Sequence, residues 1–296
     1  MSSDSPLCTG RHTFINPVND LKLEYFVNGD DTVGKPLLLV QCPGWGSGSQ
    51  YLQTCLAPLE QHFILLFLHP RGTGGSTAPA NGTEMGTMAH MSEDLEVFRV
   101  HLGLGRFPAV LGHSNGGSIV LGYAEKYPLR VEKLILISHR LVGYHERSLL
   151  LQWKDDERYK DAFEWYTSHR VKTDEDFLQL TRHVPPLFFV DPERYLPQFQ
   201  AMFVGQIQSS YCYRAQGVSD MNQDDTPQMI ARLKDVQAKT LIIFGQQDLM
   251  CEVGNAYRTK EGIPDAELIV YDDCGHIPML EKREETLHDI VAFLSS

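Results

Sequence analysis

The sequence predicts an α/β fold with a mostly parallel central sheet flanked by helices, and three observations support this prediction. Of the 296 residues 42% are apolar and 22% are charged, the composition of a globular protein that can bury a core. Short, continuous apolar runs recur along the chain, as expected of strands buried on both faces. Segments with helical spacing lie between these runs, which is the alternation of βαβ units.

The elements can be predicted in order along the chain. Residues 11–28 predict two antiparallel edge strands with Asn28-Gly29-Asp30 as the turn. Apolar side chains three and four residues apart predict helices within residues 88–102 and 287–294, and an amphipathic stretch covers 118–127. Six buried strands are expected at residues 37–40, 63–68, 109–111, 134–137, 241–244 and 268–271.

The alternation stops in the middle of the chain. Between about residues 140 and 226 there is no β-like run, and the composition becomes aromatic and charged. We therefore predict a core domain of residues 1–139 and 227–296 and an inserted helical cap of residues 140–226. Its aromatic side chains are expected to pack between the cap and the core.

A candidate nucleophile lies at Ser114, within Gly112-His113-Ser114-Asn115-Gly116. The motif follows a predicted strand and precedes a predicted helix, the setting in which G-x-S-x-G marks a nucleophile elbow. The turn is so tight that side chains two residues on either side of the serine would collide with neighbouring elements. The sequence therefore predicts an exposed serine hydroxyl above the carboxyl ends of the strands.

A serine hydroxyl needs a base and an acid that orients the base, and later strand ends supply both. The run 241–244 leads to Asp248, and the run 268–271 leads to His276, in the chain order Ser, Asp, His of this architecture. Asp272 and Asp273 compete for the acid role, but they lie close to His276 along one loop. We therefore predict Asp248 as the acid.

Two backbone amides are predicted to form an oxyanion hole. One belongs to Asn115, at the start of a helix, and the other to Trp45, in the loop after the strand at 37–40. The Trp45 side chain either walls the pocket or anchors the core. His139 and Arg140 follow a strand end and are candidates for the substrate pocket, although a loop ion pair also accounts for Arg140.

These motifs resemble those of the α/β-hydrolase superfamily, in the branch of proline iminopeptidases and related hydrolases. The resemblance covers nearly the whole chain, and it implies a cap between the sixth and seventh strands, a triad of Ser114, Asp248 and His276, and no cofactor. The matching segments are Pro43–Gly46, His69–Ser76, Gly112–Gly116, Tyr127–Val131, Gly245–Asp248, Ile263–Leu268 and Gly275-His276.

Three departures bear on specificity. Pro43-Gly44 replaces the usual His-Gly, and Asn115 replaces the tryptophan that follows the nucleophile in proline iminopeptidases. Those peptidases also hold the free amine of the substrate with cap glutamates. Here the available glutamates are explained equally well by an exposed helix face: Glu146, Glu157, Glu164 and Glu193.

Several classes of partner are excluded or not supported. With 26 Lys and Arg against 38 Asp and Glu, the net charge is 26 − 38 = −12, which repels nucleic acid. No metal-binding pattern and no membrane span is present, so no metal, cofactor or membrane is expected. The six scattered cysteines and the lack of an export signal lead us to expect a cytoplasmic protein with reduced thiols. The oligomeric state, a homodimer included, is left open.

The expected activity is cofactor-free hydrolysis of a small, largely apolar ester, lactone or amide through an acyl-enzyme. Three alternatives remain open. The first is a proline iminopeptidase, and the second is C–C bond hydrolysis, a lyase or an isomerase that uses the same triad. The third is a ligand-binding receptor with little turnover.

Overall fold

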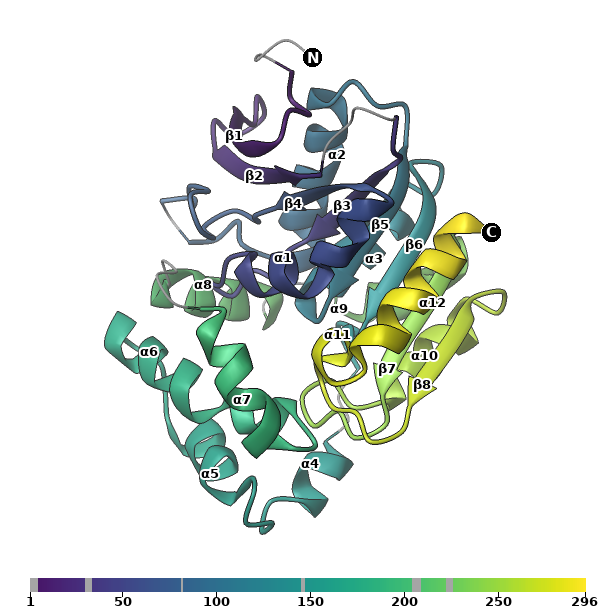
Figure 1. Cartoon of the computed structure of the whole chain (residues 1–296). Coiled ribbons are helices and arrows are strands. Elements are labelled where there is room, and N and C mark those ends of the chain that lie inside the picture. Colours follow the sequence, from purple (N-terminus) through teal and green to yellow (C-terminus); the bar gives the residue numbers. More distant parts are fainter. Residues whose placement is uncertain (1–4, 30–33, 81, 145–146, 204–208, 222–225) are drawn as a thin grey trace.

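A computed structural model describes residues 5–29, 34–80, 82–144, 147–203, 209–221 and 226–296. Its central sheet has the order β1-β2-β4-β3-β5-β6-β7-β8 (Figure 1). Strands β3 to β8 are parallel, while β1 pairs antiparallel with β2, and β2 with β4. The strands are β1 Gly10–Ile15, β2 Lys22–Asn28, β3 Leu37–Gln41, β4 Ile64–Leu68, β5 Phe107–His113, β6 Val131–Ile137, β7 Lys239–Gly245 and β8 Glu267–Tyr271.

The predicted α/β fold is confirmed, because each of the six apolar runs lies on one of the strands β3 to β8. Within such a run the side chains alternate between two buried layers. Leu134 and Leu136 of β6 belong to one hydrophobic cluster, and Ile135 and Ile137 belong to the other. Burial on both faces explains why these strands are continuously apolar rather than alternating.

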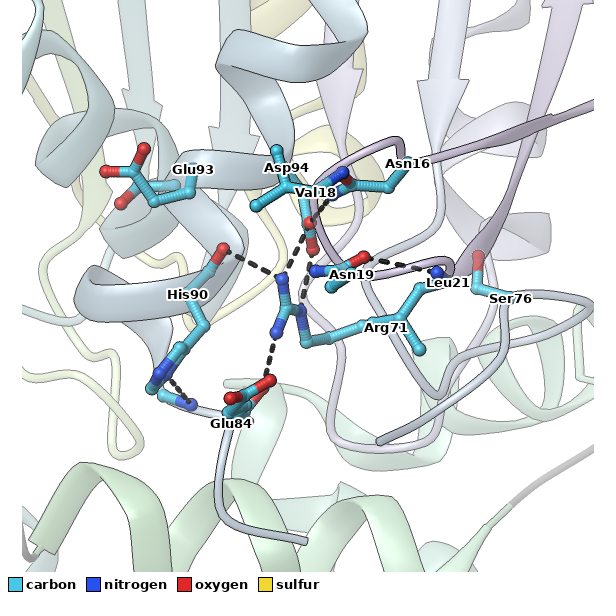
Figure 2. Close-up of polar contacts among 12 residues, drawn as sticks. Asn16, Val18, Asn19, Leu21, Arg71, Ser76, Glu84, His90, Glu93 and Asp94 are labelled. Carbon is cyan, nitrogen blue, oxygen red and sulfur yellow. Dashed lines mark hydrogen bonds and ion pairs between the residues drawn. The ribbon is translucent and has the colours of Figure 1, made fainter. Parts of the chain in front are cut away.

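The predicted turn at Asn28-Gly29-Asp30 is wrong. The register pairs Ile15 with Lys22, so the turn between β1 and β2 falls at residues 16–21. Asn28 instead ends β2, and Asp30 lies outside the described residues. The Asn19 side chain accepts a hydrogen bond from the Leu21 amide at 3.1 Å (Figure 2). This bond closes the turn between β1 and β2 locally.

Helices cover both faces of the sheet (Figure 1). The cluster on one face includes side chains of α2 Ser92–His101, α3 Asn115–Lys126 and α10 Gly254–Gly262. The cluster on the other face includes side chains of α1 Gln50–Leu56, α11 Pro278–Glu281 and α12 Arg283–Ser295. Short helical turns complete the core at η1 Ala57–Gln61, η2 Thr87–Met91 and η4 Leu233–Asp235.

All the secondary-structure elements that the structure describes between β6 and β7 are helical. Helices α4 to α7 lie together near the carboxyl ends of β6 and β7. Helix α8 lies next to the core (Figure 1). We keep the name cap for residues 140–226. The cap contains α4 Ser148–Gln152, α5 Lys160–Ser168, α6 Asp174–His183, η3 Pro185–Phe188, α7 Pro192–Ala201 and α8 Ser210–Met221, and α9 Thr226–Arg232 begins at its last residue.

A buried ion pair holds the segment that leads into η2 (Figure 2). The Arg71 guanidinium donates two hydrogen bonds to the Asp94 carboxylate, at 2.8 and 2.7 Å, and a third to the carbonyl of Glu84. Asn16 donates a further bond to Asp94 at 2.9 Å. This bidentate geometry fixes the segment that leads into η2, whose first residue is Thr87.

Candidate active site

The nucleophile elbow has the strained geometry that its sequence predicts. Ser114 follows β5 and precedes α3, and its backbone has φ 56° and ψ −126°, which is rare for a residue with a side chain. A Cβ atom at Gly112 would overlap the backbone of Gly116, and one at Gly116 would overlap the carbonyl of Gln41. Glycine is therefore required on both sides of Ser114.

The predicted base and acid lie together. His276 Nδ1 is 2.8 Å from one oxygen of Asp248, and the other oxygen accepts the amides of Met250 (2.8 Å) and Cys251 (2.9 Å). Burial alone would raise the pKa of Asp248, but the charge and hydrogen bond of His276 outweigh it, so the pKa lies below its ordinary value. The Asp248 carboxylate is therefore ionised and able to orient the imidazole.

The competing acids are not in contact with the base. Asp272 and Asp273 are both exposed and lie in the turn that follows β8. Asp248 is fully buried, and its two oxygens are occupied by His276 and by two backbone amides. Of the three carboxylates, the structure brings only Asp248 to the His276 ring.

Ser114 and His276 line one cavity of about 840 Å³ between the core and the cap. The Ser114 hydroxyl also lies against the Cys251 thiol, whose pKa burial raises well above its ordinary value, so this thiol remains protonated. Most of the wall is apolar and comes from the cap: Phe177, Leu178, Leu180, Val184, Pro185, Phe188, Phe199 and Phe203. Several aromatic cap residues thus form the cavity wall as well as packing contacts.

The two predicted oxyanion donors lie in the same wall. Asn115 begins α3, and its side chain donates to the carbonyl of Pro43 at 2.7 Å. Trp45 has φ 56°, and its ring is only partly buried and lines the cavity, so it is a wall residue and no core anchor. Its amide already donates a hydrogen bond, at 2.8 Å, to Oε1 of Gln216 in α8.

The prediction that His139 faces the pocket is wrong. Its side chain is fully buried, its Nε2 lies 2.7 Å from the Thr259 hydroxyl, and it contributes nothing to the cavity wall. The positive φ of 44° at Ser138 turns the chain, and the His139 side chain lies under Gly117, where a Cβ would overlap it. Burial lowers the pKa of His139 to about 3, so the ring is neutral.

Arg140 does line the cavity and also forms the ion pair that its position suggested. Its guanidinium donates to the carboxylate of Asp220 (2.5 Å) in α8 and to Oδ1 of Asn115 (3.0 Å). It also lies 5.6 Å from the centre of the Trp45 ring. Arg140 therefore connects α8 of the cap to Asn115, which follows Ser114.

Sequence reasoning missed the residues that hold His276 in place. His113 Nε2 donates to the carbonyl of His276 at 2.8 Å, and its Nδ1 accepts from the Tyr51 hydroxyl at 2.7 Å. Burial, together with the charge of nearby His276, lowers the pKa of His113 to about 3, so one neutral tautomer fits both bonds. The His276 amide donates to the carbonyl of Phe188 at 2.7 Å. The position of His113 beside Ser114 is the one sequence signal that pointed to it.

A second Ser–His–acid chain supports the loop that carries Trp45. Ser49 Oγ is 2.8 Å from His69 Nε2, and His69 Nδ1 is 2.8 Å from a carboxylate oxygen of Glu24. Burial would raise the pKa of Glu24, but His69, the Gly75 amide and Arg11 lower it to about 2. All three members are buried and none lines the cavity, so this chain holds β2, the Trp45 loop and the end of β4 together.

Two further features of the described residues bear on function. No group of three or more His, Cys, Asp or Glu side chains among them could hold a metal ion. No helix in that part of the chain is long and apolar enough to cross a membrane.

Comparisons with known proteins give one family. The family model for the alpha/beta hydrolase fold matches residues 37–283. Lipase 3 of Moraxella sp. (strain TA144) is 24% identical over 90% of this chain and 80% of the lipase. A proline iminopeptidase of Pestalotiopsis fici is 24% identical over 94% of this chain and 97% of its own. The structure of an esterase from Exiguobacterium antarcticum has a TM-score of 0.73 at 23% identity, covering 96% of this chain and 99% of the esterase. The chain therefore belongs to the alpha/beta hydrolase fold family and is a hydrolase.

Proposed function

We propose that this hydrolase cleaves a small, largely apolar ester through an acyl-enzyme on Ser114 and needs no cofactor. The observation that carries the proposal is that Ser114, with its strained backbone, and His276 line the same cavity. Nδ1 of His276 is held by the buried, ionised carboxylate of Asp248. Because Asp248 holds Nδ1 of His276, Nε2 is the nitrogen left to take the serine proton.

The reaction follows from these roles. His276 Nε2 removes the Ser114 proton while Oγ bonds to the carbonyl carbon, and Asp248 stabilises the resulting imidazolium. The negative charge on the carbonyl oxygen is bound by the amides of Trp45 and Asn115. The C–O bond then breaks, and His276 returns the proton to the departing alcohol. A water molecule, activated by the same histidine, releases the acid and restores Ser114.

The cavity favours an ester over a peptide with a free amino terminus. Its wall is aromatic and aliphatic, and the lipase and the esterase among the relatives are named for ester substrates. An aminopeptidase needs carboxylates near the substrate amine. Glu157, Glu164 and Glu193 are exposed and absent from the wall, and Glu146 lies outside the described residues. Of the two arginines in the wall, Arg140 is paired with Asp220, and Arg182 would repel an ammonium group.

A turnover screen with matched variants tests the proposal. p-Nitrophenyl esters of increasing chain length, a set of lactones and prolyl-p-nitroanilide are offered to the wild type, to Ser114→Ala and to Ser168→Ala. Ser168 is exposed at the end of α5 and serves as the control. We expect ester turnover that Ser168→Ala leaves unchanged and that Ser114→Ala reduces at least about 10⁴-fold.

Three results would contradict the proposal. Unchanged ester hydrolysis by Ser114→Ala would remove the acyl-enzyme. Activity that survives Ser114→Ala but is lost in His276→Ala would favour C–C bond chemistry with the same residues. Stoichiometric phosphonate labelling of Ser114 without turnover of any substrate would favour a ligand-binding receptor.

A further inference from the structure

A cap side chain occupies one of the two predicted oxyanion donors. Gln216 of α8 is fully buried, its Oε1 accepts from the Trp45 amide at 2.8 Å, and its Nε2 donates to the Thr87 hydroxyl at 3.3 Å. Because a backbone amide can only donate, the Gln216 atom that faces it must be the carbonyl oxygen. The Trp45 amide, the predicted donor to a substrate carbonyl, is therefore already bonded to a carbonyl oxygen of the protein, on a side chain that does not itself line the cavity.

The helix that carries Gln216 is bonded to the site on the same side. Asp220, four residues further along α8, accepts the Thr87 amide (2.7 Å) and hydroxyl (2.8 Å) as well as the Arg140 guanidinium (2.5 Å). Arg140 in turn donates to the Asn115 side chain at 3.0 Å. Helix α8 thus contacts both residues whose amides would form the oxyanion hole, Trp45 directly and Asn115 through Arg140.

A glycine of the Trp45 loop makes this close approach feasible. A Cβ at Gly44, whose φ is +77°, would lie 2.9 Å from Gln216 Oε1. A Cβ at Gly217 would lie 3.5 Å from the Trp45 ring, and the Tyr213 ring centre lies 5.5 Å from that of Trp45. The loop backbone and the face of α8 therefore fit against each other with the Gln216 side chain between them.

We propose that Gln216 is an autoinhibitory residue, which the carbonyl oxygen of a substrate must displace from the Trp45 amide before the oxyanion hole can act. The proposal rests on the proposed function, because it takes Ser114 as the nucleophile and Trp45 as an oxyanion donor. An amide hydrogen serves one strong acceptor at a time, so Gln216 and the substrate compete for it. Esters and phosphonates, whose C=O or P=O oxygen must bind the Trp45 amide, meet this barrier, while ligands without such an oxygen do not.

Two substitutions at Gln216 should act in opposite directions. Gln216→Leu fills a similar volume but cannot accept the Trp45 amide. It should raise the second-order rate of Ser114 labelling by a neutral p-nitrophenyl phosphonate about fivefold, the factor for one net hydrogen bond. Gln216→Glu places a carboxylate there, and its stronger, charge-assisted bond should lower the labelling rate about tenfold at pH 8. A residue with a merely structural role would give losses in both variants.

Two controls isolate the oxyanion hole. Gln198→Leu makes the same exchange at an exposed position of α7, where the glutamine donates to the carbonyl of Arg194 in its own helix, and it should leave the labelling rate unchanged. An ether analogue, in which CH₂ replaces the carbonyl of a good ester, measures cavity binding without the hole. Its inhibition constant should be the same for the wild type and both Gln216 variants.

The outcomes separate this proposal from the previous one. A slower labelling rate in Gln216→Leu, or equal losses in the leucine and glutamate variants, would overturn the autoinhibitory role. If thermal melting shows that Gln216→Leu does not fold, Gln216→Met replaces it with the same expectation. If the wild type is labelled but neither apolar variant is labelled faster, only the role of Gln216 is refuted. Folded wild type that is neither labelled nor active on any ester removes the proposed function and this inference with it.

Discussion

Replacing Asp248 by asparagine should switch the tautomer of the catalytic base. One oxygen of Asp248 accepts the amides of Met250 and Cys251, at 2.8 and 2.9 Å. In Asp248→Asn the side-chain oxygen must still accept these two amides, so the NH₂ group faces His276 Nδ1. In the wild type Nδ1 lies 2.8 Å from an acceptor oxygen of Asp248. Nδ1 then has to accept, its proton moves to Nε2, and Nε2 can no longer remove the proton of Ser114.

The expected loss is large. In serine proteases the same exchange lowers kcat by about 10⁴, and at about 1.36 kcal/mol per factor of ten this corresponds to about 5.4 kcal/mol of activation free energy. The assay is kcat for p-nitrophenyl butyrate from pH 6 to 9, with thermal unfolding recorded for each protein. Because both backbone amides keep an acceptor, we expect the fold to persist while the chemistry is lost.

A matched variant distinguishes the acids. Asp273→Asn changes an exposed carboxylate in the loop that leads to His276, and it should leave kcat unchanged. If Asp248→Asn keeps more than about a tenth of the wild-type kcat while folded, the tautomer argument is refuted. A loss confined to Asp273→Asn would move the acid to the neighbouring loop.

Two further predictions concern buried polar groups. Tyr51→Phe removes the donor to His113 Nδ1 and should lower the free energy of unfolding in urea by about 1–3 kcal/mol. It should also reduce kcat several-fold, because His113 holds the His276 carbonyl. Unchanged stability in urea would show that water replaces the hydroxyl. Glu125 of α3 is buried without a hydrogen-bond partner among the described residues, and burial raises its pKa to about 9. The folded state therefore keeps a proton that the unfolded state loses above its ordinary pKa of 4.5, so stability falls as the pH rises from about 4.5 to 9. Glu125→Gln removes this pH dependence of stability. In urea denaturation at pH 5, 7 and 9 the free energy of unfolding of the variant should rise relative to that of the wild type, by up to several kcal/mol. A difference that is the same at all three pH values would mean that Glu125 is already ionised at pH 5.

The fold and the candidate triad could be predicted because their signals are local. A strand buried on both faces must be apolar at every position, as residues 134–137 are, so the parallel sheet can be read from continuous runs. The elbow imposes glycine at Gly112 and Gly116 for steric reasons that hold in any protein with this turn. The order of strand ends then brings Asp248 to His276.

The residues that sequence reasoning missed depend on contacts between distant segments. Gln216 and Trp45 are 171 positions apart, and nothing near Gln216 in the sequence distinguishes it from the exposed glutamines of the cap. His139 follows its strand as predicted, but the backbone turn at Ser138 sends its side chain inward. Such directions are set by tertiary packing, which no local pattern encodes.

The buried chain of Ser49, His69 and Glu24 has a consequence for how activity is assigned in this family. Its atoms are spaced at 2.8 and 2.8 Å, as hydrogen-bonded nucleophile, base and acid would be, and its carboxylate is ionised. A search by interatomic distance would therefore select it. Yet no molecule can reach Ser49, and the chain serves as a clamp between strands. Ser114 lines the cavity and Ser49 does not, so access for a substrate distinguishes the proposed nucleophile as much as the spacing of three side chains does.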